Sequence, residues 1–381
     1  MHILIAPNAF KNSLTAQQAA ITIQKGLNKS GLSFTSECFP IADGGDGTAS
    51  LLIEKFNGEQ VVLTVQDALG RAIQSSFGLI DQGKTAVIEM ADASGLRLLE
   101  VSELNPLRAS SFGTGQLIKA ALDKGVNKII IAMGGSATVD GGCGILSALG
   151  FIFLDAAGNE IEAVPEKLIA LNSITCRQAD PRLKQCELII LCDVDNMLLG
   201  PDGAAAIFGP QKGADEHAVN LLDEFLTQLT NIACEQFGKQ MDQLKYGGTA
   251  GGAAAGLHVF LNAQLVNGIE YFLKITDFDQ ALEKTDLLIT GEGSIDLQTL
   301  QGKAPFGVAL RAKEKNIPVI AIAGKVPAEP ESELLKYFPV LMAIGNGPAD
   351  LPSALLHTEK NLVRTAANIG HLLSFINQQP L

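Results

Sequence analysis

Apolar runs that end in glycine-rich loops constrain the fold of this chain more than any other feature. In residues 129–149, a β-branched run gives way to a loop at 134–144 with five glycines, two hydroxyl side chains and one carboxylate, and an apolar pattern at helical spacing follows. Glycines let a backbone approach a ligand closely, and a helix N-terminus attracts negative charge. The stretch therefore predicts a strand-loop-helix unit suited to phosphate, with plain tight turns as the alternative.

Strand-helix units occupy both ends of the chain. The strand predicted at 2–6 precedes a helix that Thr15 caps, and apolar runs at 286–290, 317–324 and 340–345 predict further strands. From about residue 60 to residue 90, short apolar runs separated by turn residues instead predict antiparallel strands.

The change in pattern predicts an α/β fold with two α/β domains. We expect a Rossmann-like parallel sheet built from both chain ends, residues 1–59 and 280–381, and an inserted α/β domain with a mixed sheet at residues 60–279.

The composition excludes several classes of protein. A formal net charge of −13 leaves no basic excess for non-specific binding to nucleic acid. No apolar run is long enough to span a membrane, and no secretion signal precedes the first strand. The six cysteines form no CxxC pair, so we expect reduced thiols in a cytoplasmic protein that binds neither membranes nor nucleic acid. Whether the chain forms a homo-oligomer is left open.

Two common nucleotide-binding fingerprints are missing. The first strand lacks the GxGxxG turn of dinucleotide-binding domains, which argues against a nicotinamide or flavin enzyme. Neither Gly302-Lys303 nor Gly324-Lys325 has the flanking residues of a Walker A loop, which argues against a P-loop kinase.

Charged side chains follow several predicted strands, where open α/β sheets bind their ligands. Lys11 follows the first strand, and Asp43 and Asp46 stand among three glycines before a helix. Such carboxylates can bind Mg²⁺ or accept the proton of a hydroxyl group, although aspartate and glycine are also common turn residues. Asp193 and Asp195 end the strand at 188–192 with i, i+2 spacing, which suits a divalent cation and phosphate oxygens.

Six separate motifs occur in order along essentially the whole chain: Phe10–Leu14, Ala42–Thr48, Gly134–Gly142, Cys192–Asn196, Gly209–Ala214 and Thr290–Asp296. Together they resemble the bacterial glycerate kinase family, the type related to the glyoxylate and glucarate pathway enzymes. The resemblance implies ATP-dependent phosphorylation of D-glycerate with Mg²⁺, with 2-phosphoglycerate as the usual product and 3-phosphoglycerate as the less favoured one. It also implies two α/β domains, one of them discontinuous.

The departures from the family pattern are modest. Asn8-Ala9 stands where relatives more often have Asp-Ser, and Ser294 stands where arginine is frequent, so we assign no anion contact to Ser294.

On this basis we predict Lys11, Asp43, Asp193 and Asp296 as catalytic residues. Asp193, together with Asp195, is the expected Mg²⁺ site, and Lys11 offsets developing charge. Asp43 or Asp296 accepts the hydroxyl proton, and these two alternatives stay open. The cation for the substrate carboxylate stays open among Arg71, Arg108, Lys212 and Lys303. The residues predicted to bind nucleotide or substrate are Gly44, Gly45, Asp46, Arg71, Gly134, Gly135, Ser136, Thr138, Asp140, Lys212, Gly291, Glu292, Gly293 and Lys303.

Two other functions use similar loops. A nucleotide-binding oxidoreductase would place a pyrophosphate in the loop at 134–144, and a non-catalytic binding protein would hold a small organic acid without turnover. Binding of NAD(H) distinguishes the first alternative, and a lack of ADP formation with glycerate distinguishes the second.

Overall fold

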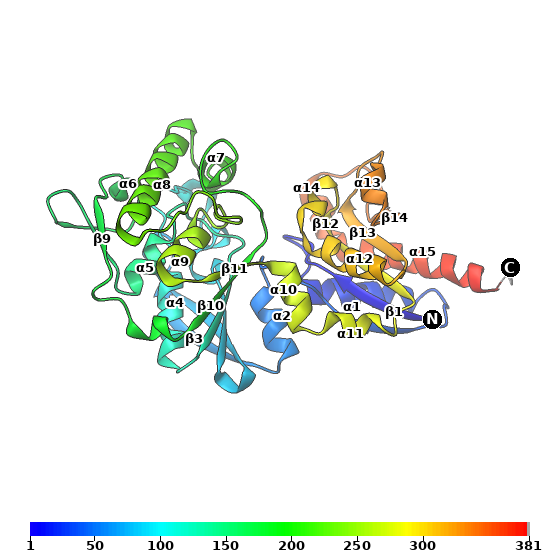
Figure 1. Cartoon of the computed structure of the whole chain (residues 1–381). Helices are drawn as coiled ribbons and strands as arrows, with labels where there is room; N and C mark the ends of the chain where they lie inside the picture. The colour runs from blue at the N-terminus through cyan, green and yellow to red at the C-terminus, as the bar shows by residue number, and fades with distance from the viewer. Residues whose placement is uncertain (379–381) are drawn as a thin grey trace. The chain divides into compact units, whose positions relative to one another are not determined.

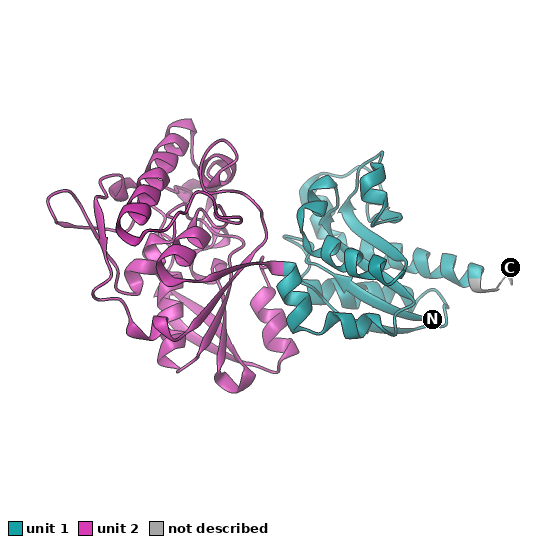
Figure 2. Cartoon of the chain, viewed as in Figure 1, with its two compact units in different colours: residues 1–43, 269–381 teal, residues 44–268 magenta. Residues whose placement is uncertain are grey.

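The computed structural model describes residues 1–378 and divides the chain into two compact units (Figure 2). Unit 1 combines Met1–Asp43 with the segment from Ile269 onward, and unit 2 is Gly44–Gly268. Both boundaries fall earlier than the predicted ones. The N-terminal boundary moves because α2 (Thr48–Lys55) is attached to unit 2, where Glu89 accepts hydrogen bonds from the N–H groups of Gly47 and Ala49.

The sheet of unit 1 is entirely parallel, as the strand-helix pattern at the chain ends predicts. Its order is β14-β13-β12-β1-β2, so β1 from the N-terminal segment pairs with β12 from the C-terminal segment. Connections leave β1 and β12 toward opposite edges of the sheet, which makes the carboxyl ends of this pair a topological switch point. The strands are β1 His2–Pro7, β2 Thr35–Cys38, β12 Leu287–Ser294, β13 Val319–Lys325 and β14 Val340–Ala343.

Helices cover this sheet (Figure 1). Thr15 caps α1 with its side chain, and Gln18 completes a capping box, as the sequence predicts for the cap. Buried apolar residues of α1 and α15 share one core with alternate residues of β1, β12 and β13. The helices of unit 1 are α1 Ala16–Leu27, α10 Gly268–Ile275, α11 Phe278–Leu282, α12 Ala304–Glu314, α13 Ser332–Leu335, α14 Leu351–Leu356 and α15 Thr358–Gln378, with a 3₁₀ turn, η6, at Leu297–Gln301.

One strand of unit 1 is longer than predicted. The residues 291–294, expected in a loop, continue β12, because Gly291, Glu292 and Ser294 pair with β13. Gly291 allows this close pairing, since a side chain there would start 2.0 Å from the carbonyl oxygen of Ile322.

Unit 2 contains the predicted mixed sheet, in the order β11-β10-β6-β5-β4-β3. The pairs β3-β4 and β4-β5 are antiparallel, whereas β5, β6, β10 and β11 run parallel and end at one edge. The predicted α/β fold, with one parallel and one mixed sheet, is therefore confirmed. The strands are β3 Glu59–Gln66, β4 Ala72–Ile80, β5 Thr85–Glu89, β6 Lys128–Ala132, β10 Glu187–Cys192 and β11 Gln264–Asn267.

A small antiparallel sheet and several helices complete unit 2. The small sheet consists of β7 Ile152–Leu154, β8 Glu160–Ile161 and β9 Ser173–Thr175. The helices after α2 are α3 Ala91–Ser94, α4 Phe112–Asp123, α5 Cys143–Ala148, α6 Pro165–Leu168, α7 Ala204–Phe208, α8 Glu216–Phe237 and α9 Ala253–Leu261, with 3₁₀ turns that include η3 Val101–Glu103 and η5 Pro210–Lys212. Within residues 1–378, no helix combines the length and the apolar composition that crossing a membrane requires.

Candidate functional site

Two glycine motifs far apart in the sequence lie against each other in unit 2. The N–H of Gly134 donates to the carbonyl oxygen of Gly44 at 2.9 Å. Neither side of this contact has room for a side chain, because a Cβ on Gly134 would lie 2.6 Å from the Cα of Gly45. Gly135 has a φ of +73°, and a Cβ there would meet a carboxylate oxygen of Asp46. The structure thus brings together four predicted glycines and Asp46, and close approach explains why glycine is needed.

A carboxylate that the sequence interpretation missed holds one of these motifs in place. Glu89, at the end of β5, accepts hydrogen bonds from the N–H groups of Gly47 at 3.2 Å and Ala49 at 2.7 Å. Burial and, less strongly, the charge of Asp92 raise the pKa of Glu89 to about 7. The available signal was a carboxylate directly after an apolar strand, the same signal that singled out Asp193.

A buried lysine reaches the loop after β6. Lys212 is only 3% exposed, and its Nζ donates to Ser136 Oγ at 3.0 Å and to the carbonyl oxygen of Thr138 at 2.7 Å. Burial lowers the pKa of Lys212 to about 7, while the charges of Asp140 and Asp193 oppose the shift. A buried ammonium with only neutral hydrogen-bond acceptors is costly and is a common mark of a functional site.

The same loop offers further unused polar groups. Thr138 Oγ1 is buried without a hydrogen-bond partner in the part of the chain that the structure describes. Within the described residues, the backbone N–H groups of Gly135 and Ser136 donate to no protein acceptor. An unpaired buried hydroxyl is uncommon in folded proteins, and with two free backbone donors beside it the loop is suited to bind a ligand.

The rest of the glycine loop has a structural role instead. The fully buried carboxylate of Asp140 accepts hydrogen bonds from Ser111 N at 2.8 Å, Ser111 Oγ at 2.6 Å, Gly142 N at 3.0 Å and Gly144 N at 3.1 Å. The N–H of Gly141 donates to the carbonyl oxygen of Gly251. The expectation that the N–H groups of the whole loop wrap a ligand is therefore wrong for residues 141, 142 and 144.

Replacing Asp140 by alanine should mainly cost stability. The change leaves the buried donors of Ser111, Gly142 and Gly144 without an acceptor, and water cannot reach them. We therefore expect the free energy of unfolding, measured by urea denaturation, to fall by about 3 kcal/mol. Asp155→Ala is the matched control, because Asp155 also accepts two backbone N–H groups but at the surface, where water replaces it. An Asp140→Ala variant of normal stability that no longer binds substrate would contradict the structural role.

Arg71 does not join this cluster. Its guanidinium pairs with Asp67 and with Glu103, each at 2.5 Å, and half of the side chain is exposed. Both neighbours raise the pKa of Arg71, and these two ion pairs already use its donors. A role for Arg71 as an anion contact stays a prediction that this geometry does not favour.

The two predicted metal ligands differ in their surroundings. Asp193 follows β10 and lies close enough to Lys212 to affect its pKa. Asp195 is about half exposed and forms an ion pair with Lys245 at 3.6 Å. Among residues 1–378, no group of three or more histidine, cysteine, aspartate or glutamate side chains is placed to hold a metal ion.

Unit 1 gathers a second set of predicted residues at the carboxyl ends of β1 and β12. Asp43 Oδ2 accepts hydrogen bonds, each 3.3 Å long, from Asn8 Nδ2 and from the N–H of Ala304 at the start of α12. Glu292 is buried and accepts a 3.3 Å hydrogen bond from Thr299 Oγ1. Burial and, less strongly, the charge of Asp43 raise the pKa of Glu292 to about 7, while Lys303 opposes the shift.

The other predicted residues of unit 1 surround this pair. The Asp296 carboxylate accepts from the N–H of Gln298 and so caps η6. Lys11 is an exposed lysine in the turn after β1, and a Cβ on Gly293 would lie 3.8 Å from its backbone nitrogen. Lys303 is the N-cap residue of α12. Asn8, which donates to Asp43, was not predicted as a site residue.

Comparison with known proteins identifies the family of this chain. The model of the glycerate kinase family matches residues 3–374. A glycerate kinase from Halalkalibacterium halodurans is 45% identical over 324 residues, 85% of each chain, and the glycerate 2-kinase of Escherichia coli is 40% identical over 378 residues, 98% of each chain. A crystal structure from Salmonella typhimurium LT2 that bears a provisional glycerate kinase 2 name superposes with a TM-score of 0.84 at 39% identity and covers 100% of both chains. With a family match over nearly its whole length and relatives of this similarity, the chain belongs to the glycerate kinase family.

Proposed function

We propose that this kinase transfers the γ-phosphoryl group of ATP to the 2-hydroxyl group of D-glycerate and so forms 2-phosphoglycerate. Buried Lys212, beside the unused donors of the loop after β6, is the observation that carries the proposal. Phosphoryl transfer requires positioning and neutralisation of charge more than covalent chemistry. The Escherichia coli relative, named glycerate 2-kinase, supports the 2-position over the 3-position.

In this proposal, unit 2 provides the anion contacts. The Lys212 ammonium and the N–H groups of Gly135 and Ser136 would bind phosphoryl or carboxylate oxygens, and Thr138 Oγ1 would complete the set. The glycines at 44–45 and 134 permit close backbone approach, and Asp46 lies next to Gly135.

Unit 1 provides the acid-base chemistry in this proposal. The sequence alone left Asp43 and Asp296 as candidate bases, but Asp296 caps η6. Glu292 is better suited to this role, because a carboxyl group with a pKa of about 7 can both accept and release a proton near neutral pH. We assign proton acceptance from the glycerate hydroxyl to Glu292, with Asp43 as its charged neighbour. Lys11, Lys303 and the strand glycines 291 and 293 would line the same acceptor side.

Asp193 and Asp195 are the proposed Mg²⁺ ligands. Mg²⁺ in kinases is usually held by one or two carboxylates together with substrate phosphates, so a pair of aspartates fits in number and in chemistry. The ion would neutralise phosphate charge. To bind the ion, Asp195 would have to leave its ion pair with Lys245. Breaking this pair costs little free energy, because both side chains are exposed.

A coupled assay of ADP release tests the proposal. With ATP and Mg²⁺, we expect ADP formation to depend on D-glycerate and to be much slower with glycolate or lactate. ADP release that no hydroxy acid stimulates would favour a non-catalytic binding protein, and binding of NAD(H) would favour an oxidoreductase. A location in a reducing compartment, the cytoplasm, fits the six free cysteines.

A further inference from the structure

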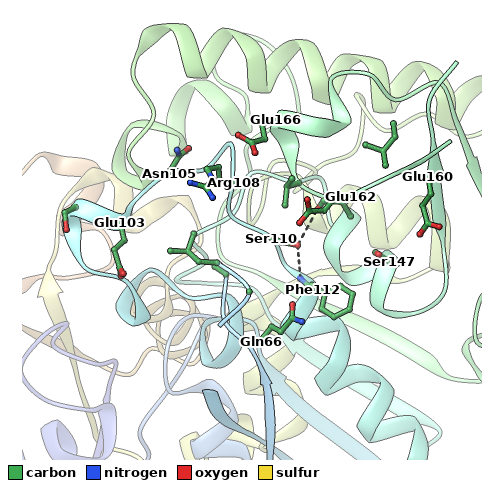
Figure 3. Close-up of a pocket in the computed structure, with 17 residues that line it drawn as sticks. Gln66, Glu103, Asn105, Arg108, Ser110, Phe112, Ser147, Glu160, Glu162 and Glu166 are labelled. Carbon is green, nitrogen blue, oxygen red and sulfur yellow. Dashed lines mark hydrogen bonds between the residues drawn. The ribbon is translucent and has the colours of Figure 1, made fainter. Parts of the chain in front are cut away.

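A large polar pocket in unit 2 has no role in the site described so far. Its volume is about 700 Å³, within the range that small ligands fill. Figure 3 shows Arg108, Glu162 and Glu166 among the residues that line it, with Ser110 and Phe112 nearby. The walls come from the end of β3 with the turn after it, from the segment at 102–112 and from the segment at 160–166.

The pocket adjoins the glycine loop on one side. Ala68 and Ala109 pack with Ala137, which belongs to that loop, and Ala68 lines the pocket. Ser111, between two pocket residues, donates to Asp140 of the loop. Buried Ala68, Ala109 and Ala137 therefore form the wall that this side of the pocket shares with the glycine loop.

On another side the pocket reaches the segment of Lys212. Residues 102, 103 and 105 line the pocket, and Leu104 lies between them in the sequence. The carbonyl oxygen of Leu104 would be only 2.3 Å from a Cβ on Gly213. Gly213 directly follows Lys212. The segment that carries the buried ammonium is thus in contact with the pocket wall.

The lining is rich in hydrogen-bond acceptors. Four glutamates line the pocket, and Arg108 is the only basic side chain among its described lining residues. No ion pair links Arg108 to any described carboxylate, although Glu103 pairs with Arg71. Carboxylates repel a free organic anion but accept hydrogen bonds from ribose hydroxyls and from an exocyclic amino group, as acidic residues do in dinucleotide sites.

We propose that this pocket binds the nucleoside moiety of the phosphoryl donor, with Glu162 and Glu166 as hydrogen-bond acceptors and Arg108 against the base. The phosphates extend from the acidic pocket toward the glycine loop and Lys212. This assignment rests on the proposed kinase function, and it gives ATP a binding place in unit 2.

Single variants at the pocket test the assignment. We expect Glu162→Ala and Arg108→Ala each to raise the KM for ATP about tenfold, equivalent to about 1.4 kcal/mol. The KM for glycerate and the melting temperature should stay the same, because both side chains are exposed. Glu235→Ala is the matched control, since Glu235 is an exposed glutamate on α8. An unchanged KM for ATP, or a raised KM for glycerate, overturns the assignment.

Adenosine binding separates this assignment from the proposed function. Calorimetric titration of the full chain with adenosine needs no turnover, and both variants should weaken binding about tenfold. If the wild type phosphorylates glycerate but the variants bind adenosine normally, only the pocket assignment fails. If the variants lose adenosine binding while no ADP forms with glycerate, the pocket assignment stands and the proposed function fails.

Discussion

Replacing Lys212 by methionine is expected to lower kcat/KM for glycerate phosphorylation by about a thousandfold, which corresponds to about 4 kcal/mol of lost transition-state stabilisation. The side chain keeps its length and apolar stem but loses the charge that faces the loop at 136–138. The free energy of unfolding should change by less than about 1 kcal/mol, because relief from burying a charge offsets two lost hydrogen bonds. Steady-state kinetics and urea denaturation of the same preparations measure both effects.

Lys239→Met is the matched control for this variant. Lys239 also donates to a backbone carbonyl, that of Val259, and to a side-chain oxygen, that of Asn262. It lies outside the cluster described above, so kcat/KM should stay within about twofold. Equal losses of activity in the two variants would contradict a specific role for Lys212.

Lys212 should also shape the pH dependence. Because its pKa is lowered to about 7, the fraction of charged Lys212 in the free enzyme falls as the pH rises above 7. If charged Lys212 binds the anion, kcat/KM of the wild type declines on the alkaline side. The decline should be absent from the low residual activity of the methionine variant.

Replacing Glu292 by glutamine is expected to lower kcat by about a thousandfold while making the fold more stable at pH 8. The amide cannot accept the hydroxyl proton, and a general base typically contributes 10²- to 10⁴-fold. The folded-state pKa of Glu292 is raised to about 7, above its ordinary value of 4.5, so the folded state loses stability as the pH rises from 4.5 to 7, and the loss is complete above pH 7. The penalty develops between pH 4.5 and pH 7, and its removal should add about 2 kcal/mol to the free energy of unfolding at pH 8.

The variant Asp296→Asn distinguishes between Glu292 and Asp296 as the residue that accepts the hydroxyl proton. Wild-type kcat should rise with pH toward 7 as Glu292 loses its proton, and the rise should disappear in Glu292→Gln. Asn at 296 keeps the capping oxygen of η6, so the rise with pH should remain. If Asp296→Asn instead removes the rise and Glu292→Gln keeps it, Asp296 is the base.

Much of the fold follows from patterns visible in the sequence. Periodicity identified the βα units and the Thr15 cap, and the change of pattern after residue 60 indicated the mixed sheet. The N-terminal boundary between the units lies earlier than predicted because, in the sequence, α2 looks like a continuation of the first βα units. Hydrogen bonds from its first turn to Glu89, across 40 residues of sequence, and its packing against β4 and β5 assign it to unit 2.

The assigned site residues stay predictions, and several of their contacts could not be foreseen from the sequence. Spacing cannot show that Asp140 is saturated by internal donors or that Arg71 is held by two carboxylates. Likewise, a turn lysine and a buried lysine look alike in a Gly-Pro-Gln-Lys-Gly sequence, and burial sets the pKa of Lys212 apart. Such facts depend on contacts between distant segments, which a single sequence does not encode locally.

Phosphorus NMR of the product tests the central claim most directly. The enzyme is incubated with ATP, Mg²⁺ and D-glycerate, and the proton-coupled ³¹P spectrum of the new phosphate ester is recorded. Transfer to the 2-hydroxyl group places phosphorus next to one methine proton, so the account predicts a doublet that grows as ATP is consumed. A triplet, from phosphorus next to a methylene group, would contradict the assigned position, and the absence of any new ester would contradict the kinase function.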